Sequence, residues 1–427
     1  MKIRRSIQLS SLTLTAVMLC GCPSDQPSNQ PNIISLTQLQ PGGWEVLFTN
    51  TSGVNITGFS TPSINTTGVF ESEITPTPVT PHCTSSITLA PNASCYYGFF
   101  GNYVKAVGTT NSGTITLSAN LASGGPLTVT LPTTLTSVLY AGNSNGNISM
   151  WNGSSWSSVG TSGLTNLTAL VVDTPYNGQF VAGTSTGCSA WNGKAWHTIS
   201  SCPNNITAFA INPKDASIAI YGATSANTNA VQKYTFDIGF TTVGTSTNNV
   251  KALITDANGD NFYAATANGI QTLAYNGSTW SNVGTNSPAG ALSLAIDGTR
   301  YLYAVTSDGA IAYANLADDP NWVTEAIPAP GEEATILAYD AATNTLYGGT
   351  NNKIFYLDSG KNRVPLTNGP TGVNALIADP VNGDLYAGNS TSIQKYNGST
   401  WTNITSANTP TNVNTLAIGQ VLDIQAP

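Results

Sequence analysis

A unit of about 40 residues recurs seven times after residue 135, and this repeat most constrains how the chain can fold. Each copy carries an apolar strand pattern with a small-residue end, such as LYAG at 139–142. The second position of the pattern falls at Tyr140, Val181, Tyr221, Tyr263, Tyr303, Tyr347 and Tyr386, in steps of 41, 40, 42, 40, 44 and 39 residues. A fixed period of this size predicts a propeller, a solenoid or another repeat array.

Each repeat contains four short strand patterns. In the last full copy they lie at 373–377, 384–387, 392–396 and 400–404. The first and third turns contain Asn-Gly, which readily adopts the positive φ that tight hairpin turns require. Four antiparallel strands at this period predict one blade of a propeller.

The number of strand patterns predicts how the ring closes. The first repeat begins at 136–140 with its second strand pattern and lacks a first one. The segment 412–418 near the end of the chain copies the missing pattern. A solenoid needs no such leftover strand, whereas pairing it with the first blade removes open sheet edges. We therefore predict a seven-bladed β-propeller over 135–427, closed by strands from both ends, with six or eight blades as the alternative.

Residues 33–134 predict a separate domain. Short alternating runs, such as WEVLF at 44–48 and TITLSA at 114–119, are bounded by turn residues. Roughly 100 residues with about seven short strands indicate a β-sandwich. The chain is thus expected to be all-β, with two domains.

The segment LAPNASC at 89–95 leads into a strand pattern and then a hairpin. It resembles the "L-x-P-G-x-C" segment of bacterial Ig-like domains of the ASPM/SPD-2/Hydin type, over about 60 residues. The resemblance implies an Ig-like sandwich for 33–134.

The last turn of four repeats also has a shared form. The four segments are WNGSSW at 151–156, WNGKAW at 191–196, YNGSTW at 275–280 and YNGSTW at 396–401. They resemble the Asp-box (BNR) repeats of sialidase-like propellers, although the aspartate of the box is missing from all four. In that family the box is structural, so the resemblance implies the fold and not glycan cleavage. We expect the aromatic side chains to pack between blades, with a sugar-binding rim as the alternative.

Two repeats depart from this form. The repeat at Tyr347 has SGKNR at 359–363 with no tryptophan, and the repeat at Tyr303 has a longer turn at 315–322. Such departures can mark function, although neutral drift is the commoner cause.

The N-terminus predicts export. Basic residues precede an apolar stretch at 7–19, too short to span a bilayer as a mature helix. The following Leu19-Cys20-Gly21-Cys22 resembles the bacterial lipobox, which implies removal of residues 1–21 and lipidation of Cys22. An ordinary secretory signal is the alternative.

The residue after Cys22 is Pro23 and not the aspartate of inner-membrane lipoproteins, which favours the outer membrane. Residues 22–32 hold mainly Pro, Ser, Gln and Asn, so they predict a flexible tether. The expected location is the cell envelope, periplasmic or surface-exposed, with membrane contact through the lipid anchor.

The cysteine count agrees with an oxidising compartment. Of six cysteines, Cys20 leaves with the signal and Cys22 carries the lipid. The four others form two local pairs, Cys83 with Cys95 and Cys188 with Cys202. Disulfides are expected, because a metal site would need further nearby ligands; we predict no metal and no cofactor.

The charge balance excludes one class of partner. Only 8% of the residues are charged and the formal net charge is −8, with no basic run. Nucleic acid is therefore not an expected partner.

No residue cluster identifies a reaction. The two histidines, His82 and His197, fall in different predicted domains, and no nucleophile motif accompanies them. Acidic residues recur where the first strand of a repeat ends, as expected of turn devices. One such turn, at 256–260, spaces its oxygens like a Ca²⁺ loop but lacks the other ligands.

These observations favour a binding or scaffold protein whose propeller recognises a protein or glycan partner. The candidate recognition loops carry Asp318, Asp319, Glu332 and Glu333. The alternative is a propeller hydrolase or lyase, acting on envelope or extracellular polysaccharide, whose carboxylates converge only after folding.

Overall fold

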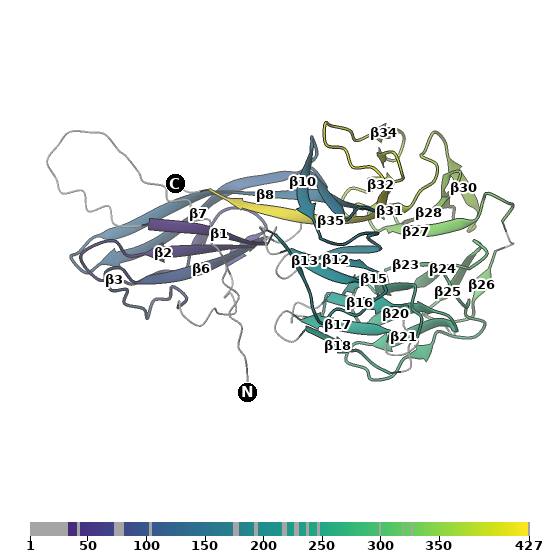
Figure 1. Cartoon of the computed structure of the whole chain (residues 1–427), viewed down its shortest axis with the longest axis horizontal. Helices are drawn as coiled ribbons and strands as arrows, with labels where there is room; N and C mark the ends of the chain where they lie inside the picture. The colour runs from purple at the N-terminus through teal and green to yellow at the C-terminus, as the bar shows by residue number, and fades with distance from the viewer. Residues whose placement is uncertain are drawn as a thin grey trace. The chain divides into compact units, whose positions relative to one another are not determined.

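The computed structural model of the chain consists of β-strands joined by turns and loops (Figure 1). It describes residues 33–40, 43–71, 81–101, 105–173, 179–191, 195–215, 220–225, 230–235, 239–245, 248–298, 300–318, 320–325 and 328–425. The predicted signal and tether, with Cys22, lie outside these residues, as does Asp319. Within the described part of the chain, no helix is long and apolar enough to cross a membrane.

The chain divides into two compact units. The first comprises Met1–Asn102, Thr110–Leu135 and Val421–Pro427, and the second Tyr103–Thr109 and Thr136–Gln420. The predicted ranges differ from this division at two places. Residues 421–427, expected in the propeller, belong to the first unit, because Leu422 and Ile424 are buried in its core. Residues 103–109, expected in the sandwich, belong to the second unit.

Two sheets enclose the core of the first unit. One has the order β1 (Ile33–Gln40), β2 (Gly43–Thr49), β6 (Ser94–Gly101) and β5 (Val69–Glu71). The other includes β3 (Ile56–Thr57), β4 (Ser63–Ile64), β7 (Thr110–Leu121) and the first part of β8 (Pro126–Asn143). Alternate residues of each sheet meet between them, so that Phe48 and Tyr97 of one pack with Ile115 and Leu117 of the other.

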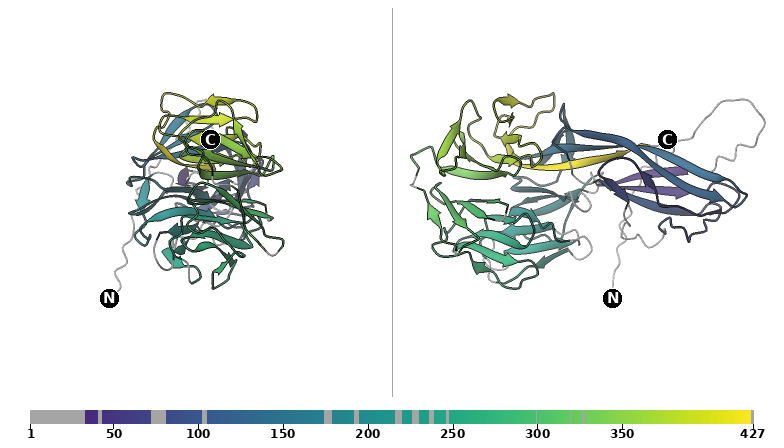
Figure 2. Two further views of the ribbon diagram at one scale, coloured as in Figure 1. Left: turned by 90° about the vertical axis from the view of Figure 1, so that its right-hand side faces the viewer. Right: turned by 180° about the vertical axis from the view of Figure 1, so that it is seen from behind.

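The second unit is a β-propeller built from successive sheets of four antiparallel strands. Figure 2 shows these sheets from two further sides. Six of them follow the chain in simple order. Their strands are β11 (Ala169–Asp173), β12 (Gln179–Thr184), β13 (Gly187–Trp191) and β14 (Trp196–Thr198); β15 (Ile206–Ile211), β16 (Ile220–Thr224), β17 (Val231–Thr235) and β18 (Gly239–Thr242); β19 (Ala252–Thr255), β20 (Asn261–Thr266), β21 (Gly269–Ala274) and β22 (Ser281–Asn282); β23 (Ser293–Asp297), β24 (Tyr301–Val305), β25 (Ile311–Asn315) and β26 (Val323–Thr324); β27 (Ala334–Asp340), β28 (Thr345–Thr350), β29 (Ile354–Leu357) and β30 (Arg363–Leu366); and β31 (Ala375–Ala378), β32 (Leu385–Gly388), β33 (Ile393–Tyr396) and β34 (Trp401–Asn403).

One further sheet draws its strands from distant parts of the sequence. Strand β8 pairs with β9 (Asn147–Trp151), which pairs with β10 (Trp156–Thr161). Strand β35 (Val413–Ile424), which contains the leftover strand pattern at 412–418, pairs with the other edge of β8. Both strands run side by side in Figure 1, β35 in yellow and β8 in blue.

The burial of the second strand of each sheet explains why the LYAG-like pattern of the repeat ends in small residues. Strands such as β16 and β32 are buried along their whole length, because neighbouring sheets cover both of their faces. A Cβ atom on Gly183 would lie 2.5 Å from Ile206 of the following sheet. A Cβ atom on Gly388 would lie 2.7 Å from Val413 of β35. Small residues at this position therefore allow adjacent sheets to approach closely.

Candidate functional site

At some interfaces between neighbouring sheets of the propeller, a tryptophan joins the two sheets by a hydrogen bond. Trp280, beside β22, donates its indole N–H to the carbonyl of Val243 in the preceding sheet at 3.0 Å. Trp322, beside β26, does the same with Val283 at 2.8 Å. The aromatic residues of the last turns thus pack between blades in these two sheets, as the repeat pattern predicts.

The same contact joins residues from the two ends of the propeller. Trp156, at the start of β10, donates its indole N–H to Ile404 O at 2.8 Å, across 248 positions of sequence. Its side chain is 2% exposed and packs in a cluster with Leu139, Ile393 and Val413. This interface therefore has the same construction as those of Trp280 and Trp322.

One interface replaces the tryptophan by an arginine. Arg363 begins β30 opposite Leu357, as Trp401 begins β34 opposite Tyr396. Its guanidinium donates to Gly309 O at 2.7 Å and forms an ion pair with the Glu325 carboxylate of the preceding sheet. Glu325 holds the same place in its sheet as Val243 and Val283 hold in theirs. In all three residues, the backbone N–H donates a hydrogen bond to the third strand of the same sheet. An ion pair therefore occupies the place at which the interfaces of Trp156, Trp280 and Trp322 have an indole N–H and a carbonyl.

A second cation crosses the same interface. The Lys361 ammonium lies 4.7 Å from the ring centre of Tyr301, 4.9 Å from that of Tyr303 and 5.9 Å from that of Tyr313. It also donates a hydrogen bond to the Tyr303 hydroxyl. Tyr301 and Tyr303 lie on β24 two residues apart, and Tyr313 of β25 is the register partner of Tyr303. The three rings therefore share one face of their sheet. We call Tyr301, Tyr303 and Tyr313 the tyrosine cluster.

The surroundings of the tyrosine cluster are electrostatically matched to a cation. Burial, the negative charge of Asp297 and a hydrogen bond with its side chain raise the pKa of Tyr303 well above its usual range. The Tyr303 side chain is 3% exposed, whereas Tyr301, Tyr313 and Lys361 are partly exposed. The positive charge of Lys361 thus lies near the rings of Tyr301 and Tyr313 and at the hydroxyl of Tyr303, which the Asp297 carboxylate also approaches.

The candidate recognition loops do not converge in this sheet. Asp318 follows β25, at the end of the sheet where β25 joins β26, and accepts a hydrogen bond from Asn315 at 2.7 Å. Glu332 and Glu333 lie between β26 and β27, at the opposite end of these strands. Glu332 pairs with Lys353, which lowers the Glu332 pKa, and Glu333 accepts the Gly331 N–H at 2.6 Å.

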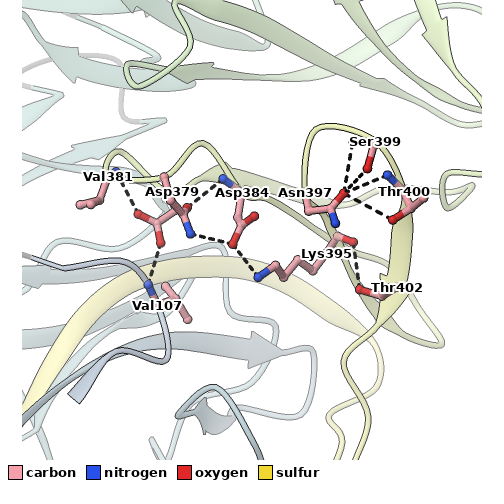
Figure 3. Close-up of polar contacts among 10 residues, drawn as sticks. Val107, Asp379, Val381, Asp384, Lys395, Asn397, Ser399, Thr400 and Thr402 are labelled. Carbon is pink, nitrogen blue, oxygen red and sulfur yellow. Dashed lines mark hydrogen bonds and ion pairs between the residues drawn. The ribbon is translucent and has the colours of Figure 1, made fainter.

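The recurrent acidic residues are engaged in turns (Figure 3). Asp379 accepts the backbone N–H of Val381 at 3.0 Å and that of Val107 at 2.7 Å. Asp384 pairs with Lys395 at 2.5 Å. At the candidate calcium loop, both oxygens of Asp256 accept protein hydrogen bonds, which come from Asp260 N at 2.7 Å and Asn261 Nδ2 at 3.0 Å. Among the described residues, no three potential ligands are grouped to hold a metal ion.

The first unit contains a cavity of about 430 Å³. His82 lies beside it and forms an ion pair with Glu71 at 3.1 Å, and the Phe59 ring contributes to its wall. Burial raises the pKa of Glu71, and the His82 charge partly offsets this effect. His197 lies on β14 of the second unit, so the two histidines belong to different units. The cavity therefore holds one carboxylate and one imidazole from the described residues.

Both cysteine pairs lie at disulfide distance. The sulfur atoms are 1.99 Å apart for Cys83 and Cys95 and 1.93 Å apart for Cys188 and Cys202. The first pair lies in the first unit and the second in the propeller, 12 and 14 positions apart in sequence.

We expect replacement of both Cys188 and Cys202 by alanine to destabilise the propeller by roughly 3 kcal/mol, because a cross-link closing a loop of this length restricts the unfolded chain. The shift of the urea midpoint, followed by circular dichroism, measures this loss. Reduction of a variant that already lacks Cys83 and Cys95 should reproduce it, because only the Cys188–Cys202 bond is then broken. An unchanged midpoint in both experiments would contradict the prediction.

Solved structures include proteins with a similar fold. The β-propeller domain of Cps50 (Swd1) from Myceliophteria thermophila matches with a TM-score of 0.45 and 14% sequence identity. The match covers 59% of this chain and 90% of that domain. No protein-family model matches the chain, and no curated protein matches it.

Proposed function

We propose that this chain is a lipid-anchored binding or scaffold protein of the cell envelope. Its second unit is a closed seven-bladed propeller that recognises a protein or glycan partner, and its first unit is an Ig-like spacer. Disulfides in both units and the export pattern at residues 1–22 support an envelope location.

The binding role is supported by what the ionisable side chains of the propeller contact. Among the described residues, these side chains contact turns and neighbouring strands of the protein itself. The ion pairs are Lys214 with Asp260, Lys233 with Asp215, Lys353 with Glu332, Arg363 with Glu325, and Lys395 with Asp384. Catalytic carboxylates need to face a substrate together, so this distribution favours a framework for recognition over a hydrolase or lyase.

The proposed ring closure rests on two sets of contacts. On one side, Trp156 and Leu139 pack with Tyr386 and Ile404 of the β31–β34 sheet. On the other side, the rings of Tyr140 and Phe180 lie 4.4 Å apart and link β8 to the β11–β14 sheet. With β35 as its fourth strand, the sheet of β8–β10 then counts as the seventh blade.

The partner is tested by site-specific photo-crosslinking in cells. A crosslinker at Asn352 probes the end of the blades that carries Glu332, and one at Asp318 probes the opposite end. We expect one position, and not both, to give a discrete adduct. Release of new reducing ends from envelope polysaccharide by the purified chain, with no adduct, would instead favour the enzyme.

The lipid anchor gives a separate prediction. With a fatty-acid analogue, we expect the parent and a Cys20→Ser variant to be labelled in cells and a Cys22→Ser variant to remain unlabelled. The reason is that the modified cysteine must be the residue that follows cleavage. Continued labelling of Cys22→Ser would contradict this site.

A further inference from the structure

We propose that Asn152 and Asn397 are sites of intramolecular deamidation, at which the propeller converts an asparagine to an aspartate or an isoaspartate without the help of another protein. Each residue precedes a glycine in a hairpin turn, Asn152 between β9 and β10 and Asn397 between β33 and β34. The inference does not depend on which partner the propeller recognises.

The reaction consumes only water. The backbone nitrogen of the glycine attacks Cγ of the asparagine side chain and loses its proton, and the side-chain nitrogen leaves as ammonia. Water then opens the resulting cyclic succinimide at either of its carbonyl carbons, which gives an aspartate or an isoaspartate. Two features of a turn therefore favour the reaction: a glycine N–H that is free to react, and hydrogen-bond donors at the side-chain oxygen, where negative charge develops during the attack.

The turn at Asn397 has both features (Figure 3). The Asn397 Oδ1 atom accepts the backbone N–H of Ser399 at 3.1 Å and that of Thr400 at 2.9 Å. It also accepts the Ser399 hydroxyl at 2.9 Å and the Thr400 hydroxyl at 3.4 Å. Within the described part of the chain, the Gly398 N–H donates to no acceptor. The turn thus polarises the side-chain carbonyl and leaves the attacking nitrogen free.

The turn at Asn152 repeats this arrangement. The Asn152 Oδ1 atom accepts the backbone N–H of Ser154 at 3.1 Å, the Ser154 hydroxyl at 3.0 Å and the backbone N–H of Ser155 at 3.0 Å. The Gly153 N–H, like that of Gly398, has no acceptor among the described residues. Both asparagines are exposed, so water can reach the succinimide.

The protein contains its own control for this inference. The hexapeptide YNGSTW occurs at 275–280 and again at 396–401, but the two copies form different turns. Asn276 has a φ of 63°, and no described residue donates a hydrogen bond to its side chain. The Gly277 N–H donates to Ala274 O at 2.7 Å, so the nitrogen that would attack is already engaged. The same six residues are therefore reactive in one sheet and protected in another.

The protection seen at Asn276 recurs in other Asn-Gly pairs of the propeller. In each of these pairs the glycine N–H is bonded to a backbone carbonyl of its own turn. The donors are Gly146, Gly259 and Gly383, and their acceptors are Asn143 O at 3.1 Å, Asp256 O at 3.0 Å and Asp379 O at 3.0 Å. The Asn-Gly sequence alone therefore does not make a site, and the turn decides which pairs react.

The test follows aspartate and isoaspartate formation in the purified full chain, incubated at mildly alkaline pH in water enriched in heavy oxygen. Ring opening inserts one labelled oxygen, so peptide mapping by mass spectrometry identifies each site. We expect Asn397 and Asn152 to react at least about tenfold faster than Asn276 in the folded protein, because Gly277 must first break its hydrogen bond. In urea, where the turns are lost, Asn397 and Asn276 should react at equal rates.

A matched pair of variants tests the donors. Ser399→Ala removes one donor to Asn397 Oδ1 and should slow that site severalfold. Ser278→Ala, at the same place in the other hexapeptide, should leave the rate at Asn276 unchanged. Circular dichroism that matches the parent shows that each variant is folded.

Three results would overturn the proposal. The first is a rate at Asn397 or Asn152 in the folded parent that is no higher than the rate at Asn276. The second is a difference between Asn397 and Asn276 that persists in urea, because it would then not come from the turns. The third is an unchanged rate at Asn397 in Ser399→Ala. None of these results bears on crosslinking to the partner, so the two proposals fail separately.

Discussion

Replacing Arg363 by tryptophan is expected to destabilise the propeller by about 3 kcal/mol, and adding Glu325→Gln should recover most of that loss. The single change leaves the Glu325 carboxylate in a largely buried interface without its cation, and breaking such a pair is strongly unfavourable. In the double variant, the introduced indole can use the contact that Trp280 and Trp322 make elsewhere, an N–H donating to a carbonyl.

The choice of glutamine preserves a second contact. Glu325 Oε1 accepts the backbone N–H of Ile311 at 2.6 Å, and the amide oxygen of glutamine can accept the same bond. An apolar residue would leave that N–H unsatisfied. The carboxylate charge is therefore the main quantity that differs between the single and the double variant.

Urea midpoints of the parent, both single variants and the double variant form a double-mutant cycle. Lys353→Gln is the control, because the Lys353–Glu332 pair is exposed and such a pair contributes at most about 1 kcal/mol. A double variant as unstable as Arg363→Trp would show that the ion pair is not equivalent to the tryptophan contact.

The second large effect is expected at Trp156. A Trp156→Ala change should destabilise the propeller by about 3–5 kcal/mol, because it empties a buried aromatic site and removes the indole donor to Ile404. Trp156→Phe retains most of the ring packing and loses the hydrogen bond, so we expect about 1–2 kcal/mol for it.

Hydrogen exchange distinguishes this interface from the others. In Trp156→Ala, amide exchange should accelerate in β31–β34 and β35, which lie far from Trp156 in sequence. In Trp322→Ala, the effect should fall on β19–β26, the two sheets that this residue joins. If exchange accelerated equally and uniformly in both variants, Trp156 would not act specifically at the interface between the first and last sheets.

Much of the propeller could be predicted because its residues repeat. The period of the LYAG-like pattern indicates one sheet per repeat, and the copied pattern at 412–418 indicates the strand that pairs with β8. Tryptophan at the last turn also indicates contacts between blades, since a large amphipathic ring at a recurring place in the repeats meets the same kind of neighbour.

The interface with Lys361 and Arg363 could not be predicted in this way. Its sequence signal was the absence of tryptophan at 359–363, which does not indicate what the substituted cations contact. Arg363 and Glu325 are 38 positions apart, and Lys361 and Tyr303 are 58 apart. Contacts of single side chains over such separations follow no period, so only folding brings them together.

The role of residues 105–109 was also missed. In the sheet of β15–β18, the side chain of Asn212, which follows β15, donates a hydrogen bond to Gly259 O at 3.0 Å. Gly259 lies in the turn that joins β19 and β20, the first two strands of the next sheet. The sheet of β8–β10 has no turn joining its first and second strands, because β35 and β8 are far apart in sequence. Val107 supplies a backbone N–H to Asp379 there, from a segment whose sequence resembles no repeat.

The origin of β35 also orders events during synthesis. A ribosome releases β8, β9 and β10 well before residue 413, so their sheet waits with one edge uncovered while the six others are made. A nascent chain stopped short of Val413 would expose that edge to other strands. The sheet of β8–β10 can therefore be completed only after β35 has been synthesised.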